Sequence, residues 1–311
     1  MLPTKYYHVV FTVPHELHSI FLSNRKKMFD LIFEAGHYTI NKLGRDPQWL
    51  GATPGIVSIL HTHGQDLCFH PHIHCIVSGG GVDQSDKWVN CKRSNGKFLF
   101  PRRVMELMYK ARFLKRLRAL LGDGELIIPE DFDSTVIEVV GYKKWNVYAK
   151  APFGGPAQII EYLGRYTHKV AITSHRITNI GNTTVTFNYK DYKDGSKVKS
   201  MTLTHEEFVR RYELHILPFK YVKIRHAGYM CHRGKSERIA NLCQQLELPK
   251  PMPKVAMSVG LCILLKTGID ITICKKCNQG KLVLKDSLIM WNGELKSVYE
   301  IRNKGMPKAS R

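Results

Sequence analysis

The chain has 311 residues, of which 43% are hydrophobic and 10% aromatic, so it can build a core and is no disordered tail. Its formal net charge of +21 favours a polyphosphate partner, and its longest apolar run, around 259–265, is too short to span a membrane. Because the start has no signal-peptide pattern and the eight cysteines are scattered, we expect a cytoplasmic protein with reduced thiols that contacts nucleic acid.

The first half of the chain predicts alternating strands and helices. Residues 6–13 are β-branched and aromatic and end at Pro14, which predicts a strand. Residues 15–43 carry apolar residues at helical spacing and predict one helix that ends near Gly44. The next expected elements are strands at 55–63 and 72–79 joined by a polar turn at 64–71, a short hairpin at 83–100, and a basic helix at 101–121.

The second half continues the alternation. Residues 146–151 predict a strand, and Pro156 after two glycines opens a helix at its first position. The later expected elements are strands within 172–203, helices at 206–214 and 235–246, a proline-rich linker at 248–254, and a tail. This order predicts an α+β fold, in which helices cover one face of an antiparallel sheet and a small β-rich and helical region follows.

Histidines are concentrated in one short stretch, because five of the fifteen fall within residues 61–74. Side chains alternate along a strand, so His72 and His74 point to one face while Ile73 and Cys75 point to the other. The apolar face must be the buried one. Two imidazoles therefore lie side by side on the opposite face.

A neighbouring strand can supply a third imidazole. The turn after residues 55–63 closes a hairpin that brings His61 or His63 beside His72 and His74. Three neutral imidazoles can bind a divalent ion and leave coordination positions open, which predicts metal chemistry. Solvated surface histidines are the alternative, and a structural zinc site is another, although such sites favour four ligands and cysteine.

The helix predicted after Pro156 combines phenols with cations. Its core stripe is expected to consist of Ile159, Ile160 and Leu163. Tyr162 and Tyr166 are four residues apart on one edge of that stripe, with Lys169 on the same side and Arg165 beside it. This arrangement suits phosphate chemistry, whereas tyrosines at the edge of a core are the alternative. Paired with the histidine strand, the phosphate interpretation is favoured.

Together these motifs resemble the HUH single-strand endonucleases, and among them the two-tyrosine transposases of the insertion sequence 91 family. The resemblance extends through about residue 247. It rests on the segments YYHVVFTVPHEL (6–17), LHTHGQDLCFHPHIHCIVSGGG (60–81), KFLFPRRV (97–104), VYAKAPFGGPAQIIEYLGRYTHKVAITSHRI (147–177) and KIRHAGYM (223–230).

The resemblance implies a ferredoxin-like catalytic domain at residues 1–170, with a helical insertion at about 101–145. An extension at 171–247 completes the transposase domain, and 248–311 form a linker and tail. The two metal ligands of the family correspond to His72 and His74, and its two nucleophiles to Tyr162 and Tyr166.

The third metal ligand implied by the resemblance is His61. It lies eleven residues before His72, the spacing found in related conjugative relaxases, and Gln65 is the alternative. The expected cofactor is Mg²⁺ or Mn²⁺. Arg165 and Lys169 are expected to contact DNA phosphate.

The function implied is rolling-circle transposition in a bacterial cell. The enzyme would nick and rejoin single-stranded DNA at element ends and target through a 5′-phosphotyrosine, with no membrane partner. One rival is a plasmid replication initiator or relaxase of the same chemistry. Another is a non-catalytic DNA-binding protein derived from a transposon.

The two ends of the chain carry further expectations. The family usually has a zinc-binding segment before the YYHVVFTVP-like strand, so we expect this chain to lack it and to be impaired in recognising element ends. In the tail, Cys274 and Cys277 have the spacing of half a zinc site. Because a full site needs upstream ligands, free thiols are the preferred interpretation. The candidate upstream ligands are Cys262, Cys243, Cys231 and His232.

Overall fold

The structure is a computed structural model. It describes residues 2–91, 98–153, 158, 159, 161, 164, 171–192, 194–249, 258–282, 288–291 and 294–297. The chain divides into two compact units, residues 1–251 and 252–311, and each is described on its own. Among the described residues, no helix combines the length and the apolarity that crossing a bilayer demands.

The first unit is built on an antiparallel sheet in which the histidine-rich strand is central. The strand order is β5-β1-β3-β2-β9, and β4 pairs with the end of β3. The strands are β1 (Tyr6–Thr12), β2 (Thr53–His63), β3 (Phe69–Val82), β4 (Trp88–Asn90), β5 (Val147–Phe153) and β9 (Ile224–Ala227). Thus β1 and β2 flank β3, and their side chains can meet those of β3.

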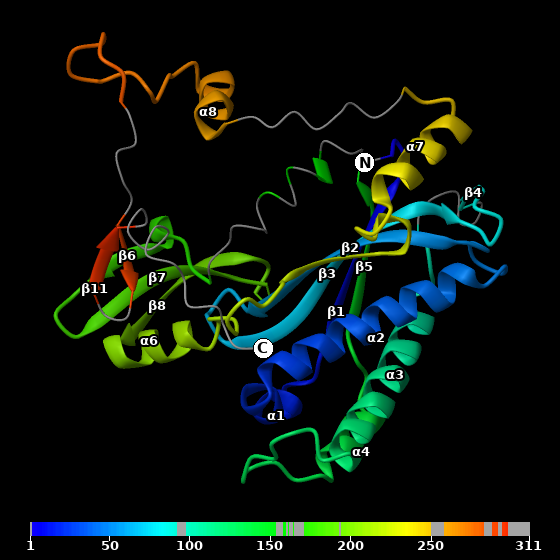
Figure 1. Ribbon diagram of the computed structural model, residues 1–311. Coiled ribbons are helices and arrows are strands. Elements are labelled where there is room, and N and C mark those ends of the chain that lie inside the picture. The colour runs from blue at the N-terminus through cyan, green and yellow to red at the C-terminus, as the bar shows by residue number, and fades with distance from the viewer. Residues whose placement is uncertain are drawn as a thin grey trace. The chain divides into compact units, whose positions relative to one another are not determined.

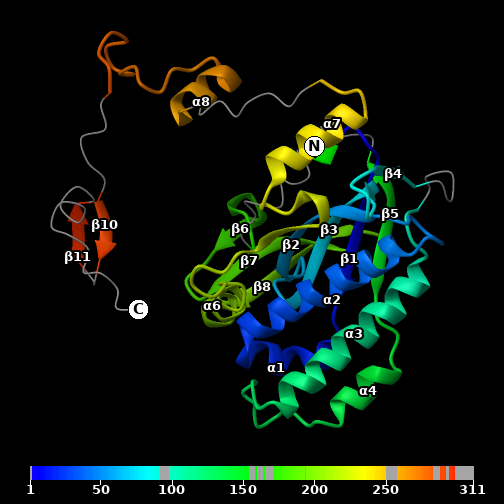
Figure 2. The same cartoon turned by 45° about the vertical axis from the view of Figure 1, so that its right-hand side comes forward.

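One face of this sheet is covered by the helices α2 and α3, as Figures 1 and 2 show. The helices of this part are α1 (His18–Ser23), α2 (Arg25–Arg45), α3 (Arg102–Gly122) and α4 (Val136–Tyr142), preceded by a short 3-10 helix at His15–Leu17. Gly36 lets α2 approach β3 closely, because a Cβ there would lie 2.7 Å from Cδ1 of Ile73. The predicted α+β class, with an antiparallel sheet and helices across one face, is confirmed.

The single helix predicted over residues 15–43 was wrong in one respect, because a break at Asn24 divides it. The Asn24 amide donates to the carbonyl oxygens of Ile20 (3.1 Å) and Ile127 (2.6 Å) and accepts from the Ile127 backbone N–H (2.8 Å). An asparagine side chain that bonds backbone groups competes with the helical ladder. Ile127 is distant in sequence, so local periodicity could not indicate the break.

The opposite face of the sheet carries a smaller apolar cluster next to the histidines. Its members are Leu2, Tyr6, Val57, Ile76, Ile159, Tyr229, Met230, Leu242 and Cys243, all buried. Leu242 and Cys243 come from α7 (Lys235–Gln245), which packs against the 3-10 helix at Gly228–Met230. Strand β9, which precedes that turn, was not predicted from the sequence.

Gly228 is required where the chain leaves β9. Its φ is +61°, and a Cβ would lie 1.7 Å from the carbonyl oxygen of Pro54. Only glycine accommodates both this left-handed backbone and so close an approach. The position ties β9 to the start of β2.

A three-stranded sheet forms the remaining part of the first unit. It contains β6 (Ile177–Ile180), β7 (Thr184–Asp191) and β8 (Lys197–Thr204), and α6 (His205–Glu213) follows directly. A 3-10 helix at Ser174–Arg176 precedes β6. The strands, the turns near 181 and 195 and the helix agree with the elements expected from the sequence.

The second unit contains a helix and a hairpin. The helix α8 (Val259–Thr267) starts at Ser258, whose hydroxyl accepts from the Leu261 N–H (3.2 Å), and ends at Gly268 with φ +71°. The hairpin pairs β10 (Leu288–Trp291) with β11 (Glu294–Ser297). Between helix and hairpin, an isolated bridge joins Ile273 and Lys281.

Candidate metal centre

Three histidines meet on the face of the sheet opposite α2 and α3. One ring nitrogen from each of His61, His72 and His74 lies within 4.8 Å of the others. The register explains the grouping, because His61 lies directly opposite His72 across the β2–β3 pair and Ile59 lies opposite His74. The pair His72 and His74 predicted from strand alternation, with His61 from the neighbouring strand, is therefore a real spatial group.

A chain of hydrogen bonds orients two of these rings. The Nδ1 of His72 lies 2.6 Å from the backbone oxygen of His70, so Nδ1 carries the proton and donates. The Nε2 of His72 then has a free lone pair and accepts from Nε2 of His74 at 3.1 Å. Accordingly, Nδ1 of His74 accepts from Nε2 of His8 at 2.8 Å. This tautomer assignment is the one in which every contact of the chain has one donor and one acceptor.

The sequence pattern gave no reason to select His8. It is buried on β1, sixty-six residues before His74 in the chain, and its ring is nearly parallel to that of His74 (9° between planes, 5.1 Å between centroids). The alternation of β1 places it on the same face as Val10, which lies opposite His74. Only the β1–β3 register could have identified it.

The three rings fit a divalent metal ion. Two ligands about 2.1 Å from one ion, at 90° to 109°, lie about 3.0 to 3.4 Å apart. The 3.1 Å between the Nε2 atoms of His72 and His74 falls within that range. A metal at this place would replace the shared proton, and His61, with a ring nitrogen within 4.8 Å of those of His72 and His74, would supply a third ligand.

The environment keeps the rings of His72 and His74 neutral, as metal ligation requires. Burial, with the neighbouring imidazole of His70 as a smaller cause, lowers the pKa of His72 to about 3. Burial also holds the pKa of His74 well below its usual range, with a further contribution from His72. A neutral imidazole presents the lone pair that a metal needs.

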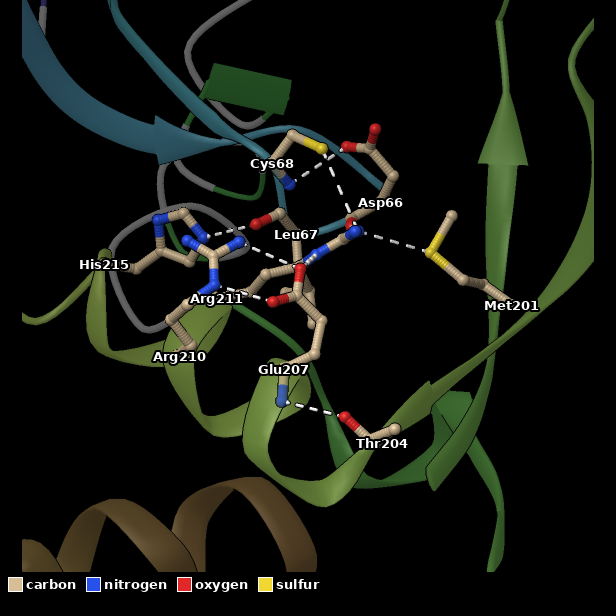
Figure 3. A network of polar contacts seen from close by, with 9 residues as sticks. All are labelled: Asp66, Leu67, Cys68, Met201, Thr204, Glu207, Arg210, Arg211 and His215. Carbon is tan, nitrogen blue, oxygen red and sulfur yellow. Dashed lines mark hydrogen bonds and ion pairs between the residues drawn. The ribbon is translucent and has the colours of Figure 1, made fainter. Parts of the chain in front are cut away.

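The turn between the two ligand strands is held by α6 (Figure 3) and by the 3-10 helix at Ser174–Arg176. Arg211 donates to the carbonyl oxygen of Asp66 (3.2 Å) and is itself held by Glu207 (2.6 Å). Arg176 donates to the carbonyl oxygen of Gln65. The turn thus receives cationic donors from two elements that follow it by more than a hundred residues.

Leu67 stands at the centre of this turn in a conformation that leucine disfavours. Its φ is +62°, in the left-handed region, where a non-glycine residue costs about 1 kcal/mol or more. Its side chain is fully buried with Ala171, Ile172 and Phe187, and His215 donates to its carbonyl oxygen (3.0 Å). The same His215 ring contacts Thr62 of β2 (3.2 Å), so one side chain connects the turn to the end of β2.

One cavity borders the triad at His61, and a second lies at the end of β1 beside His70. The first, about 210 Å³, lies along β2 and includes His61, His63, Tyr212, His215 and Lys223 in its lining. The second, about 430 Å³, lies at the end of β1 and includes Thr12, His70, Lys143, Lys144 and Trp145. The first cavity therefore places a lysine and a tyrosine beside His61 and His63, and the second places two lysines beside His70.

The structure describes some of the remaining predicted site residues and not others. Tyr162, Arg165, Tyr166 and Lys169 lie outside the described residues. Ile159, predicted in the core stripe of the same helix, is fully buried with Tyr6, Val57 and Ile76, on the histidine face of the sheet. Gln65, the alternative third ligand, has its backbone oxygen bound to Arg176.

The basic helix expected at 101–121 lies on the other face of the sheet. As α3 it packs into the main core, and several of its cations hold neighbouring structure. Arg102 and Arg103 contact buried Glu106, Arg112 pairs with Glu34 of α2, and Lys110 donates to the carbonyl oxygen of Gly141 (2.6 Å). These contacts favour a structural role for this helix over a role beside the triad.

Comparison with known proteins gave consistent matches. Residues 55–238 match the model of a family described as "Putative transposase". A "Putative transposase y4qJ" of Sinorhizobium fredii is 34% identical over 301 residues, which are 91% of this chain and 73% of the relative. A "Transposase for insertion sequence element IS801" of Pseudomonas savastanoi pv. phaseolicola is 28% identical, covering 80% of this chain and 60% of the relative.

Among solved structures, TrwC complexed with a 27-mer DNA comprising the recognition hairpin and the cleavage site shows a TM-score of 0.30 at 10% identity. The alignment covers 78% of this chain and 75% of that one. The conjugative relaxase TrwC in complex with oriT DNA also gives a TM-score of 0.30, at 11% identity, with 78% and 71% covered.

Proposed function

Because this chain belongs to the "Putative transposase" family that its residues 55–238 match, we propose that it nicks and rejoins single-stranded DNA in rolling-circle transposition of an insertion sequence. The observation that carries the proposal is the triad of His61, His72 and His74 on the face of the sheet opposite α2 and α3.

The triad would bind Mn²⁺ or Mg²⁺. Imidazole nitrogens suit Mn²⁺ better than Mg²⁺, which prefers oxygen ligands. When bound, the ion supplies Lewis-acid polarisation of the scissile phosphate. The chain's own contribution is to hold the neutral rings of His72 and His74 in place through the carbonyl oxygen of His70 and through His8, and to hold the turn between β2 and β3 through Arg211.

Tyr162 and Tyr166 are the proposed nucleophiles. Support comes from Ile159, which precedes Tyr162 by three residues and is buried on the histidine face. In each cleavage, one phenolic oxygen bonds to phosphorus while the bond to the 3′ oxygen breaks. The phenolic proton passes through water to the departing 3′ oxygen. A 5′-phosphotyrosine and a free 3′-hydroxyl result, so the energy of the phosphodiester is retained for rejoining.

The DNA would cross β3 between the two cavities. Lys223 and Tyr212 on one side offer charge for phosphates and a ring for bases, and Lys144 on the other side offers charge. Arg165 and Lys169 are proposed to neutralise charge on the attacked phosphate. The substrates would be element ends and target DNA in the bacterial cytoplasm. The family match favours transposition over plasmid initiation or conjugative relaxation.

The proposal is tested with labelled single-stranded oligonucleotides from the element ends and Mn²⁺. The wild-type chain is expected to give a covalent protein–DNA adduct, which Tyr162→Phe together with Tyr166→Phe abolishes. Tyr142→Phe is the matched control, because Tyr142 is 91% exposed on α4. An undiminished adduct in the double variant would reject the nucleophiles. No adduct from the folded wild-type chain would favour a non-catalytic DNA-binding protein.

A further inference from the structure

The second unit contains a turn that presents two thiols together, in a segment that the proposed DNA chemistry does not use. The backbone N–H of Cys274 donates to the carbonyl oxygen of Gly280 (2.7 Å), beside the bridge between Ile273 and Lys281. The N–H of Asn278 donates to the carbonyl oxygen of Cys274 (2.8 Å), with Asn278 itself at φ +54°. The turn is therefore closed by its own backbone at both ends.

The turn also stabilises a thiolate. The Gly280 N–H donates to the sulfur of Cys277 at 3.3 Å, and a Cβ on Gly280 would lie 3.4 Å from that sulfur. Donors aimed at sulfur favour the form that binds metal. The thiols lie in a turn and not at a helix N-terminus, where reactive cysteine pairs of redox proteins are found.

The turn holds only half of a metal site. Structural zinc takes four protein ligands in tetrahedral geometry. Residues 252–311 contain one other cysteine, Cys262, and no histidine. Within the part of the chain that the structure describes, the only group of three or more metal-binding side chains is the histidine triad, so Cys262 does not join Cys274 and Cys277.

We propose that Cys274 and Cys277 bind zinc jointly with the same two residues of a second copy of this chain. Two half-sites give four thiolates around one ion, the ligand set that closed structural zinc sites use. Such a centre carries two negative charges. Lys275 and Lys276, between the cysteines in each copy, offset them. The site links two chains and is independent of the histidine triad, whose ligands are imidazoles.

The test uses the full-length reduced protein with Co²⁺ as a spectroscopic probe. Expected are a thiolate-to-cobalt charge-transfer band at half an ion per chain, and a doubling of mass in sedimentation that EDTA reverses. Replacing Cys274 and Cys277 by Ser removes both, and Cys262→Ser changes neither. Imidazole-bound Co²⁺ at the triad gives no thiolate band, so failure here leaves the proposed DNA chemistry untouched.

Three outcomes would overturn the proposal. A thiolate band at one ion per chain in a monomer would mean that the site is completed without a second copy. A mass doubling that persists in EDTA would mean that another surface joins the chains. Absence of any thiolate band, with both thiols reduced and titratable, would mean that the turn binds no metal.

Discussion

The hydrogen bond from His8 to His74 predicts that a residue outside the metal shell controls metal affinity. If His74 ligates a metal through Nε2, its Nδ1 must carry the proton and donate to His8. The Nε2 of His8, which donates in the metal-free chain, must then accept instead. In His8→Phe the metal-bound form would lose the acceptor that His8 offers to Nδ1 of His74. Such a loss costs about 1–3 kcal/mol, and removing comparable partners of metal ligands weakens binding by about 10–100-fold.

The assay is Mn²⁺ binding, followed by the electron paramagnetic resonance signal of the free ion, which reports affinity without any activity. We expect His8→Phe to weaken binding by about 10–100-fold. His8→Gln, whose amide oxygen can accept near the position of Nε2, should lose less. Thermal unfolding without metal shows whether each variant folds. If folded His8→Phe bound Mn²⁺ within about threefold of wild type, well below that range, the positioning role would be refuted.

Three further predictions concern the third metal ligand, the turn between the ligand strands and a buried histidine of α2. His61→Ala should weaken Mn²⁺ binding more than His63→Ala, measured in the same assay, and the reverse order would mean that the third ligand is misassigned. Arg211→Met should lower the free energy of unfolding in urea by about 1.5–3 kcal/mol, because Arg211 holds the turn between β2 and β3. Arg210→Met should change it by no more than about 0.5 kcal/mol, because Arg210 contacts Glu207 and not the turn. Equal losses in the two variants would show that Arg211 does not stabilise the turn. Burial lowers the pKa of His37 to about 4, so its ring stabilises the fold fully above about pH 6.5 and loses this contribution as the pH falls toward 4. In His37→Gln the fall in unfolding free energy between pH 7 and pH 5 should shrink by about 2 kcal/mol, and an unchanged fall would show that this ring does not titrate with unfolding.

The sequence alone determined which side chains of the histidine strand share a face. Alternation along β3 separates His72 and His74 from Ile73 and Cys75, and the structure places the second pair in the core beneath α2. The hairpin between β2 and β3 is equally local, because a short turn leaves few registers in which both apolar faces are buried. For this reason the sequence alone could place His61 beside His72 and His74.

Local pattern could not determine contacts between segments that are distant in the chain. His8 meets His74 only because β1 pairs with β3 in one particular register, with Val10 opposite His74. The break at Asn24 likewise depends on Ile127, more than a hundred residues later. Strand β9 has only four residues, too few for an alternating pattern that would predict a strand. These residues form a strand because they pair with the edge of β2.

The turn at residues 64–68 likewise combines a feature that the sequence predicted with one that tertiary contacts decided. The sequence determined that a polar turn joins the two ligand strands, since its residues favour turns. Its conformation, with Leu67 at φ +62°, was decided by the burial of that side chain and by donors from Arg211 and His215. A backbone state that is unfavourable in isolation persists only where tertiary contacts outweigh its cost, so no local pattern can predict it.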